Sequence, residues 1–207
     1  MKTIAILAVA AATNTCALAQ SIPQAIDRGG LDAARQAVPV CMKFGFDTPL
    51  LSSAEKLASK MFDEIGVKIE WSEQDDCYLR AGAIVVTLSY AIDPGKRPGA
   101  YAFARPYEGT NIGVFWDRIQ HKLPPPKSSI LLGHVLAHEI THILQIDTRH
   151  SETGVMKAAW SDDDFFQMVK RPLRFTAKDV QLIYLGMAAR STFLHHDAKE
   201  YHNGDPL

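Results

Sequence analysis

The feature that most constrains this chain is the residue spacing within 138-HEITH-142. On an α-helix, positions four apart are separated by about 40° around the axis and about 6 Å along it. His138 and His142 therefore project from one face, and Glu139 points to the neighbouring sector. A spacing of three or five residues would splay the two rings apart. We expect a helix over residues 130–146 that presents two imidazoles side by side.

The surroundings of this motif favour a metal ion over an ordinary hydrogen-bonded core. The predicted helix is apolar at most other positions, and burying imidazoles without partners is unfavourable. A catalytic zinc site has three protein ligands and one position left for water. We predict His150 as the third ligand, with Asp147 as the competing candidate. His134, one turn before His138, is expected to be a hydrogen-bonded group behind the site.

Residue patterns along the chain predict an α+β fold. Strands are expected over 38–44, 67–71, 83–88, 100–105 and 112–115, and helices over 48–65, 130–146 and 176–189. This order predicts a twisted, mixed, mostly parallel sheet of four to five strands with helices on one side and a C-terminal helix. Pro106 confines the 100–105 strand to an edge of the sheet or to a strand end.

The first residues are predicted to be a targeting segment. Lys2, a short apolar run and 17-ALA-19 are typical of a signal peptide cut after Ala19, which indicates a secreted or periplasmic protein. Residues 20–37 are expected to be a linker or short pro-segment, 38–194 one domain and 195–207 a polar tail. No other run is long and apolar enough to span a membrane.

Cysteine content and charge limit the remaining options. Removal of residues 1–19 leaves Cys41 and Cys77, which we expect to form one disulfide in an oxidising compartment, with two buried thiols as the alternative. The net charge of −1 gives no basic excess, which argues against a nucleic-acid partner. We expect a monomer.

The order of several motifs along the chain resembles that of one protein family. A strand at 112-IGVFWD-117 precedes the 138-HEITH-142 helix, a His-Ser step, a Gly-x-Met turn and a closing helix that begins 175-FTAKDV-180. This order resembles the catalytic domain of metzincin-type zinc metalloproteases, in particular the matrix metalloproteases, over most of residues 38–189. The pattern HExxHx7HS…GVM is also similar to small secreted bacterial proteins of this type.

The resemblance implies a role for each motif residue. His138, His142 and His150 would bind one zinc ion, Glu139 would be the general base, and Met156 would be the Met-turn residue beneath the zinc. Zinc would acidify a water and polarise a peptide carbonyl, and the glutamate would transfer the proton to the leaving amine. The family fold implies an edge strand over the motif helix. A peptide or protein substrate would add to this strand, which comprises Ala100, Tyr101, Ala102, Phe103, Ala104 and Arg105.

The chain departs from the family pattern where it returns to the metal. Gln145 stands where metzincins have a glycine, and His150 follows His142 by eight residues rather than six. A helix that does not turn at Gln145 needs a longer return, so we expect a wider loop. Ala158 stands where a tyrosine ligand would follow Met156 by two residues, so no such ligand is expected.

Two alternatives to a peptidase remain open. A non-catalytic secreted zinc-binding protein on a metzincin-like scaffold would have a fourth protein ligand, His134 or Asp147, that closes the site. A weaker option is metal capture by tail histidines 195, 196 and 202.

Overall fold

The computed structural model describes residues 37–43, 49–73, 80, 82–89, 99–107 and 110–202, and for 193–202 only the backbone. The predicted signal peptide and nearly all of the 20–37 segment lie outside these ranges. Five strands form one sheet in the order β2-β1-β3-β5-β4. They are β1 (Val38–Lys43), β2 (Ile69–Glu73), β3 (Ile84–Ser89), β4 (Ala102–Ala104) and β5 (Asn111–Phe115).

The sheet is mostly parallel, as predicted. β1 pairs in parallel with β2 and β3, and β3 pairs in parallel with β5. β4 alone runs antiparallel, next to β5 at one end of the sheet, with Phe103 opposite Gly113. A Cβ atom at Gly113 would lie 2.4 Å from the Phe103 ring, so the glycine leaves room for this ring. β4 is shorter than the predicted 100–105 strand.

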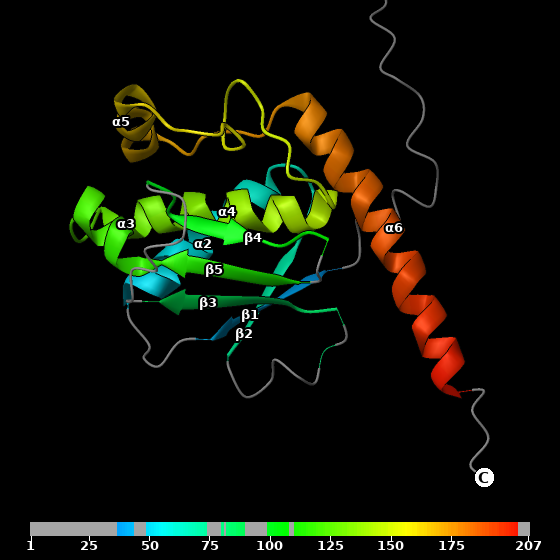
Figure 1. Cartoon of the computed structure of the whole chain (residues 1–207). Helices are drawn as coiled ribbons and strands as arrows, with labels where there is room; N and C mark the ends of the chain where they lie inside the picture. The colour runs from blue at the N-terminus through cyan, green and yellow to red at the C-terminus, as the bar shows by residue number, and fades with distance from the viewer. Residues whose placement is uncertain are drawn as a thin grey trace, which may run out of the picture.

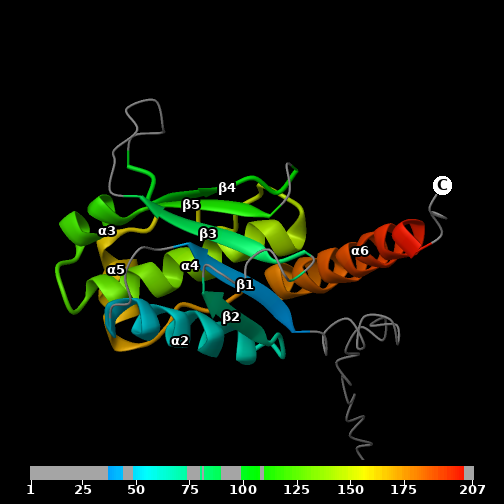
Figure 2. The ribbon, with the colours of Figure 1, turned by 90° about the horizontal axis from the view of Figure 1, so that it is seen from below.

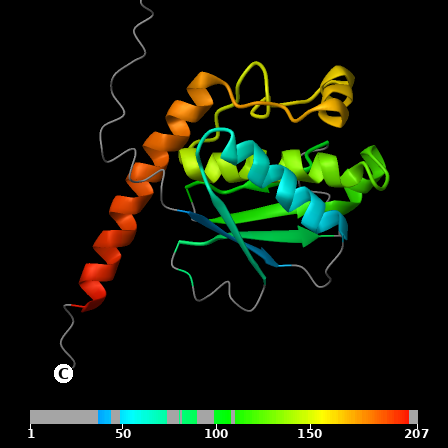
Figure 3. The ribbon, with the colours of Figure 1, turned by 180° about the vertical axis from the view of Figure 1, so that it is seen from behind.

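Two helices cover one face of the sheet (Figures 1 and 3). They are α2 (Pro49–Asp63) and α4 (Ser128–Gln145). They cross closely at Gly133, where a Cβ atom would lie 2.9 Å from Leu57 Cβ and 3.0 Å from the Ala54 carbonyl oxygen. The glycine therefore allows α2 to pack directly on the helix that carries the histidines.

Helix α4 is the centre of the hydrophobic core. All of its residues except Ile130 are buried, which is typical of an internal helix rather than a surface one. Leu136 and Ile140 belong to the same buried cluster as Val86 and Val114 of the sheet. Full burial of each such side chain contributes about 1.5–3 kcal/mol. The 138-HEITH-142 motif therefore lies on a rigid, interior element.

The remaining helices are α3 (Trp116–Lys122), α5 (Asp162–Lys170) and α6 (Ala177–His202). The sequence patterns did not predict α3 or α5, and α6 runs past the expected end at residue 189. Figure 2 shows the C-terminal part of α6 projecting beyond the sheet. The tail histidines 195, 196 and 202 belong to this helix. None of the described helices has the length and apolar character of a membrane span.

Cys41 is buried in β1 and is disulfide-bonded. Cys77 lies outside the described residues, so its pairing with Cys41 stays a prediction.

Candidate metal centre

The backbone fixes the protonation of the two helix histidines. His138 Nδ1 lies 2.8 Å from the Val155 carbonyl oxygen, and His142 Nδ1 lies 2.9 Å from that of Asp147. A carbonyl oxygen only accepts, so each ring carries its proton on Nδ1 and donates it there. Each Nε2 atom therefore carries a lone pair. Burial favours these neutral rings and lowers the pKa of His138 to about 3 and of His142 to about 4.

The two lone pairs face each other. His138 Nε2 and His142 Nε2 are 3.1 Å apart, with no proton available for either of them to share. Two lone pairs at this distance repel each other. A cation bound between them would remove the repulsion, because it would accept both lone pairs. Two nitrogen ligands of a tetrahedral zinc ion with ordinary Zn–N bonds are about 3.3 Å apart. The spacing of the rings thus fits zinc to within a few tenths of an ångström.

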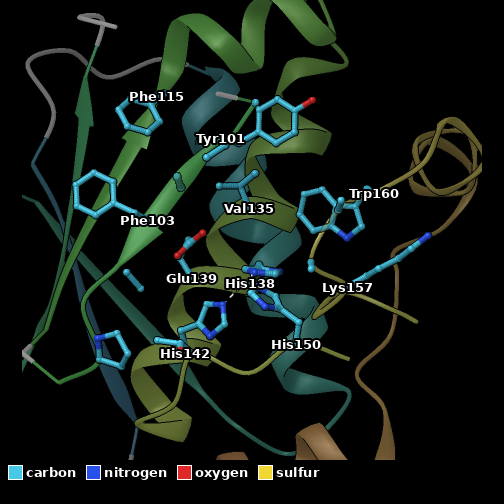
Figure 4. A pocket seen from close by; sticks show the side chains of 18 residues that line it. Tyr101, Phe103, Phe115, Val135, His138, Glu139, His142, His150, Lys157 and Trp160 are labelled. Atoms are coloured by element: carbon cyan, nitrogen blue, oxygen red, sulfur yellow. Dashed lines mark hydrogen bonds between the residues drawn. The ribbon is translucent and has the colours of Figure 1, made fainter. Parts of the chain in front are cut away.

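His150 completes the group. Its ring centroid lies 5.2 Å from that of His138 and 4.9 Å from that of His142. One ligand atom from each ring lies within 4.8 Å of the others. His138 and His142 are buried, whereas His150 is exposed. Figure 4 shows the three histidines gathered at one place in the pocket. The structure thus brings together the three histidines that the sequence singled out, and imidazoles are suitable zinc ligands.

The chain returns toward the histidine group by a turn at Ile146. This residue ends α4 in the left-handed region, with φ 52° and ψ 40°. For an L-residue this conformation costs on the order of 1–2 kcal/mol, and glycine avoids most of that. The turn comes one residue after Gln145, which stays helical as expected. The turn places the Asp147 carbonyl oxygen where it accepts the hydrogen bond from His142 Nδ1.

His134 and Asp147, the two competing ligands, are hydrogen-bonded to backbone groups. The Asp147 carboxylate accepts a hydrogen bond from the Arg149 backbone N–H at 3.1 Å. His134 Nδ1 donates to the Ile130 carbonyl at 2.7 Å, and its Nε2 accepts from the Leu173 N–H at 3.0 Å. Both ring nitrogens of His134 are therefore used. Among the described residues, the only group of potential metal ligands contains neither of these two side chains.

Glu139 lies between the histidines and the edge strand (Figure 4). Its side chain is buried, and burial raises the pKa of the carboxyl to about 8, while a hydrogen bond from the Ala104 backbone opposes this shift. The Phe115 N–H donates to the Tyr101 carbonyl, and the Arg105 N–H donates to the Asn111 carbonyl.

These bonds show which backbone groups of β4 are open. Backbone groups alternate in direction along a strand, and those of Tyr101 and Arg105 are directed at β5. The polar backbone groups of Ala102 and Ala104 therefore point away from the sheet. The Ala104 N–H is the one that reaches Glu139. Ala100 and Arg105, the predicted ends of this strand, lie just outside β4.

A cleft of about 900 Å³ connects these groups. Tyr101, Val135 and Trp160 lie together on one side of it (Figure 4). The Trp160 ring is 5.6 Å from the His138 ring, measured between centroids. The cleft therefore joins the histidines and Glu139 to the edge of the sheet through a largely aromatic wall.

Met156 is fully buried in the turn after His150. Its carbonyl accepts the Ser151 N–H at 2.8 Å, and the preceding Val155 carbonyl orients the His138 ring. Gly154 makes this turn possible with φ 77°, where a Cβ atom would lie 2.2 Å from the Arg174 carbonyl oxygen. Sequence reasoning did not identify the Val155 and Asp147 carbonyls, because only the fold directs a backbone group at a distant ring.

Comparison with known proteins agrees with this architecture. No protein-family model and no curated protein sequence matches the chain. The structure is similar to the crystal structure of archaemetzincin from Methanopyrus kandleri, with a TM-score of 0.52 and 16% sequence identity. The similarity covers 78% of this chain and 98% of the archaemetzincin chain. The protein thus has an archaemetzincin-like fold, and it carries a three-histidine group that can hold a metal ion.

Proposed function

We propose that this protein is a secreted, zinc-dependent endopeptidase that hydrolyses peptide bonds. The observation that carries the proposal is the pair of Nε2 lone pairs 3.1 Å apart, beside His150 and in an open cleft with Glu139. An ordinary core would not leave two lone pairs facing each other. The archaemetzincin-like fold supports the same conclusion.

His138, His142 and His150 would hold the zinc ion through neutral imidazoles. When bound, zinc supplies Lewis acidity that polarises a peptide carbonyl and lowers the pKa of a water. The Val155 and Asp147 carbonyls keep the protons of two rings on Nδ1, so Nε2 stays available without a proton having to leave.

Glu139 would act as the general base and acid. One carboxylate oxygen takes a proton from the attacking water and later delivers it to the nitrogen of the leaving amine. Burial favours the protonated form of this carboxyl, and a cation beside it favours the ionised form, so the group can serve in both directions. The bond from the Ala104 N–H holds the carboxylate next to the strand edge.

The open edge of β4 would bind the substrate. An extended peptide can add to this edge through the outward N–H and carbonyl groups of Ala102 and the outward carbonyl of Ala104, because the Ala104 N–H already bonds to Glu139. A peptide bond held there lies close to Glu139, which already contacts the same edge. Tyr101, Val135 and Trp160 would contact an apolar side chain of the substrate.

The alternative is a secreted zinc-binding protein without turnover. It requires a fourth protein ligand that closes the metal site. Both ring nitrogens of His134 are used in hydrogen bonds, and the group of potential metal ligands among the described residues contains neither His134 nor Asp147, which speaks against either of them in that role. We therefore favour a site with a position left for water.

The test compares Glu139→Gln with Glu152→Gln, the same substitution at an exposed glutamate. We expect both variants to bind one zinc ion per chain, as measured by elemental analysis. Only Glu139→Gln should lose cleavage of fluorescently labelled, unfolded casein, by about 100-fold or more. Undiminished cleavage by Glu139→Gln contradicts the assignment. A wild-type chain that binds zinc and cleaves nothing supports the non-catalytic alternative.

A further inference from the structure

Asp179 is a fully buried carboxylate outside the cleft, in the first turn of α6. Both of its oxygens are engaged, and they serve different parts of the chain. Oδ2 accepts from the Thr176 backbone N–H at 2.9 Å and from the Thr176 hydroxyl at 2.7 Å. The Asp179 N–H donates to the same hydroxyl at 3.2 Å, so this half of the network caps α6.

The other oxygen holds the two neighbours of His150. Oδ1 accepts from Arg149 Nη1 at 2.9 Å and from the Ser151 hydroxyl at 2.6 Å. Arg149 Nη2 also lies 3.4 Å from Ser151 Oγ. Charged and short hydrogen bonds of this kind are the stronger ones. They fix the backbone on both sides of the exposed histidine to the start of a 26-residue helix.

Asp179 also contacts the other end of the loop. Its backbone carbonyl accepts from Gln145 Nε2 at 3.2 Å, and Gln145 is the last residue of α4. The irregular segment between α4 and Ser151 is therefore anchored to one residue at its start and at its finish. His150 is the only member of the histidine group that comes from this segment rather than from the helix.

We propose that Asp179 is a positioning residue, which holds His150 in place for metal binding through Arg149 and Ser151. This inference rests on the proposed metal site. A capping carboxylate needs only Oδ2, and the bonds to Oδ1 are not required to start α6. The hydrogen bonds to Oδ1 and those to Oδ2 can therefore be removed independently of each other.

The test removes one hydroxyl from each half. Ser151→Ala deletes a bond to Oδ1, and Thr176→Val deletes a bond to Oδ2 while keeping the branched side chain. Both variants lose a hydroxyl bond to the same buried carboxylate, so similar decreases in thermal stability are expected. The affinity of the full chain for Zn²⁺ alone is then measured by competition with a chromophoric chelator.

We expect Ser151→Ala to weaken Zn²⁺ binding about 10-fold or more, as for other groups that orient a metal ligand, and Thr176→Val by less than about 2-fold. The visible spectrum of bound Co²⁺ should change in Ser151→Ala and match the wild type in Thr176→Val. Equal affinities in the two variants overturn the inference, because Asp179 is then only a structural cap.

His150→Ala separates failure of this inference from failure of the proposed site. If His150→Ala loses affinity and Ser151→Ala does not, the metal site stands and the role of Asp179 is wrong. If His150→Ala binds Zn²⁺ as tightly as the wild type, both proposals are wrong.

Discussion

His134 tests the buried arrangement behind the metal site. The ring is fully buried, donates from Nδ1 to the Ile130 carbonyl and accepts the Leu173 N–H at Nε2. In His134→Leu the Leu173 N–H has no acceptor at this position. An orphaned buried donor costs about 1–3 kcal/mol, and we expect the free energy of unfolding at pH 7.5 to fall by that amount.

The difference should depend on pH in a defined direction. Burial lowers the pKa of His134 from 6.5 to about 4, so the folded state prefers the neutral ring. The neutral ring therefore contributes its whole stabilisation above pH 6.5, the pKa of histidine in the unfolded chain. This stabilisation is lost as the pH falls toward about 4, the pKa of His134 in the folded protein. The loss is about 2 kcal/mol at pH 5 and about 3 kcal/mol at pH 4. Leucine does not titrate, so the two proteins should converge near pH 5.

The assay is urea unfolding of both proteins, followed by circular dichroism between pH 7.5 and pH 4 with a metal chelator present. The histidines of the site titrate in both proteins, so their effect cancels in the difference. If the difference in unfolding free energy between the two proteins stays constant over this pH range, His134 is not a neutral ring with hydrogen bonds at both nitrogens. In the wild type, the NMR signal of the His134 ring should titrate near pH 4.

Three further predictions concern packing, acidity and processing. Gly186→Ala places a Cβ atom 1.8 Å from the Leu144 carbonyl oxygen and must separate α6 from α4, so we expect a loss of about 3 kcal/mol and a fall in Tm of about 6–12 °C by calorimetry. Between pH 7 and pH 5 the logarithm of the zinc affinity should change by less than about two per pH unit, because the Nε2 atoms of His138 and His142 carry no proton there; a steeper slope in chelator competition contradicts the buried neutral rings. Intact mass of the exported protein should give Gln20 as the first residue, and a chain that keeps residues 1–19 would disprove the cleavage site.

The local part of the site was readable from the sequence. Helical periodicity alone places His138 and His142 on one face, because the relation between spacing and direction is a property of the backbone. The apolar β-branched run in β3 likewise indicated a buried strand of a mostly parallel sheet. These predictions depended on contacts between near neighbours in sequence.

The return of the chain was only partly predictable. Gln145 correctly indicated that the helix would not turn there, but no glycine marks Ile146 as the turning point. The left-handed turn is held by tertiary contacts, including the bond from Gln145 to the Asp179 carbonyl and the Asp147 carbonyl on His142. A β-branched residue adopts this conformation only when its surroundings fix it.

The starts of helices α5 and α6 have contacts that sequence patterns did not predict. Sequence patterns did not predict α5, yet Ser161 and Asp164 form a capping box at its start. In the sequence, Asp179 was noted only as part of 175-FTAKDV-180 at the start of the closing helix. Its bonds to Arg149 and Ser151 span 30 and 28 residues of sequence, and no local pattern reports such contacts.

The most direct measurement is a crystal structure of the zinc-loaded protein, with the ion located by its anomalous scattering. We predict one ion bound by Nε2 of His138, Nε2 of His142 and a ring nitrogen of His150, with a water molecule as the remaining ligand. An ion located elsewhere, or one whose fourth ligand is His134, Asp147 or another protein side chain, would contradict the proposal of a catalytic zinc site.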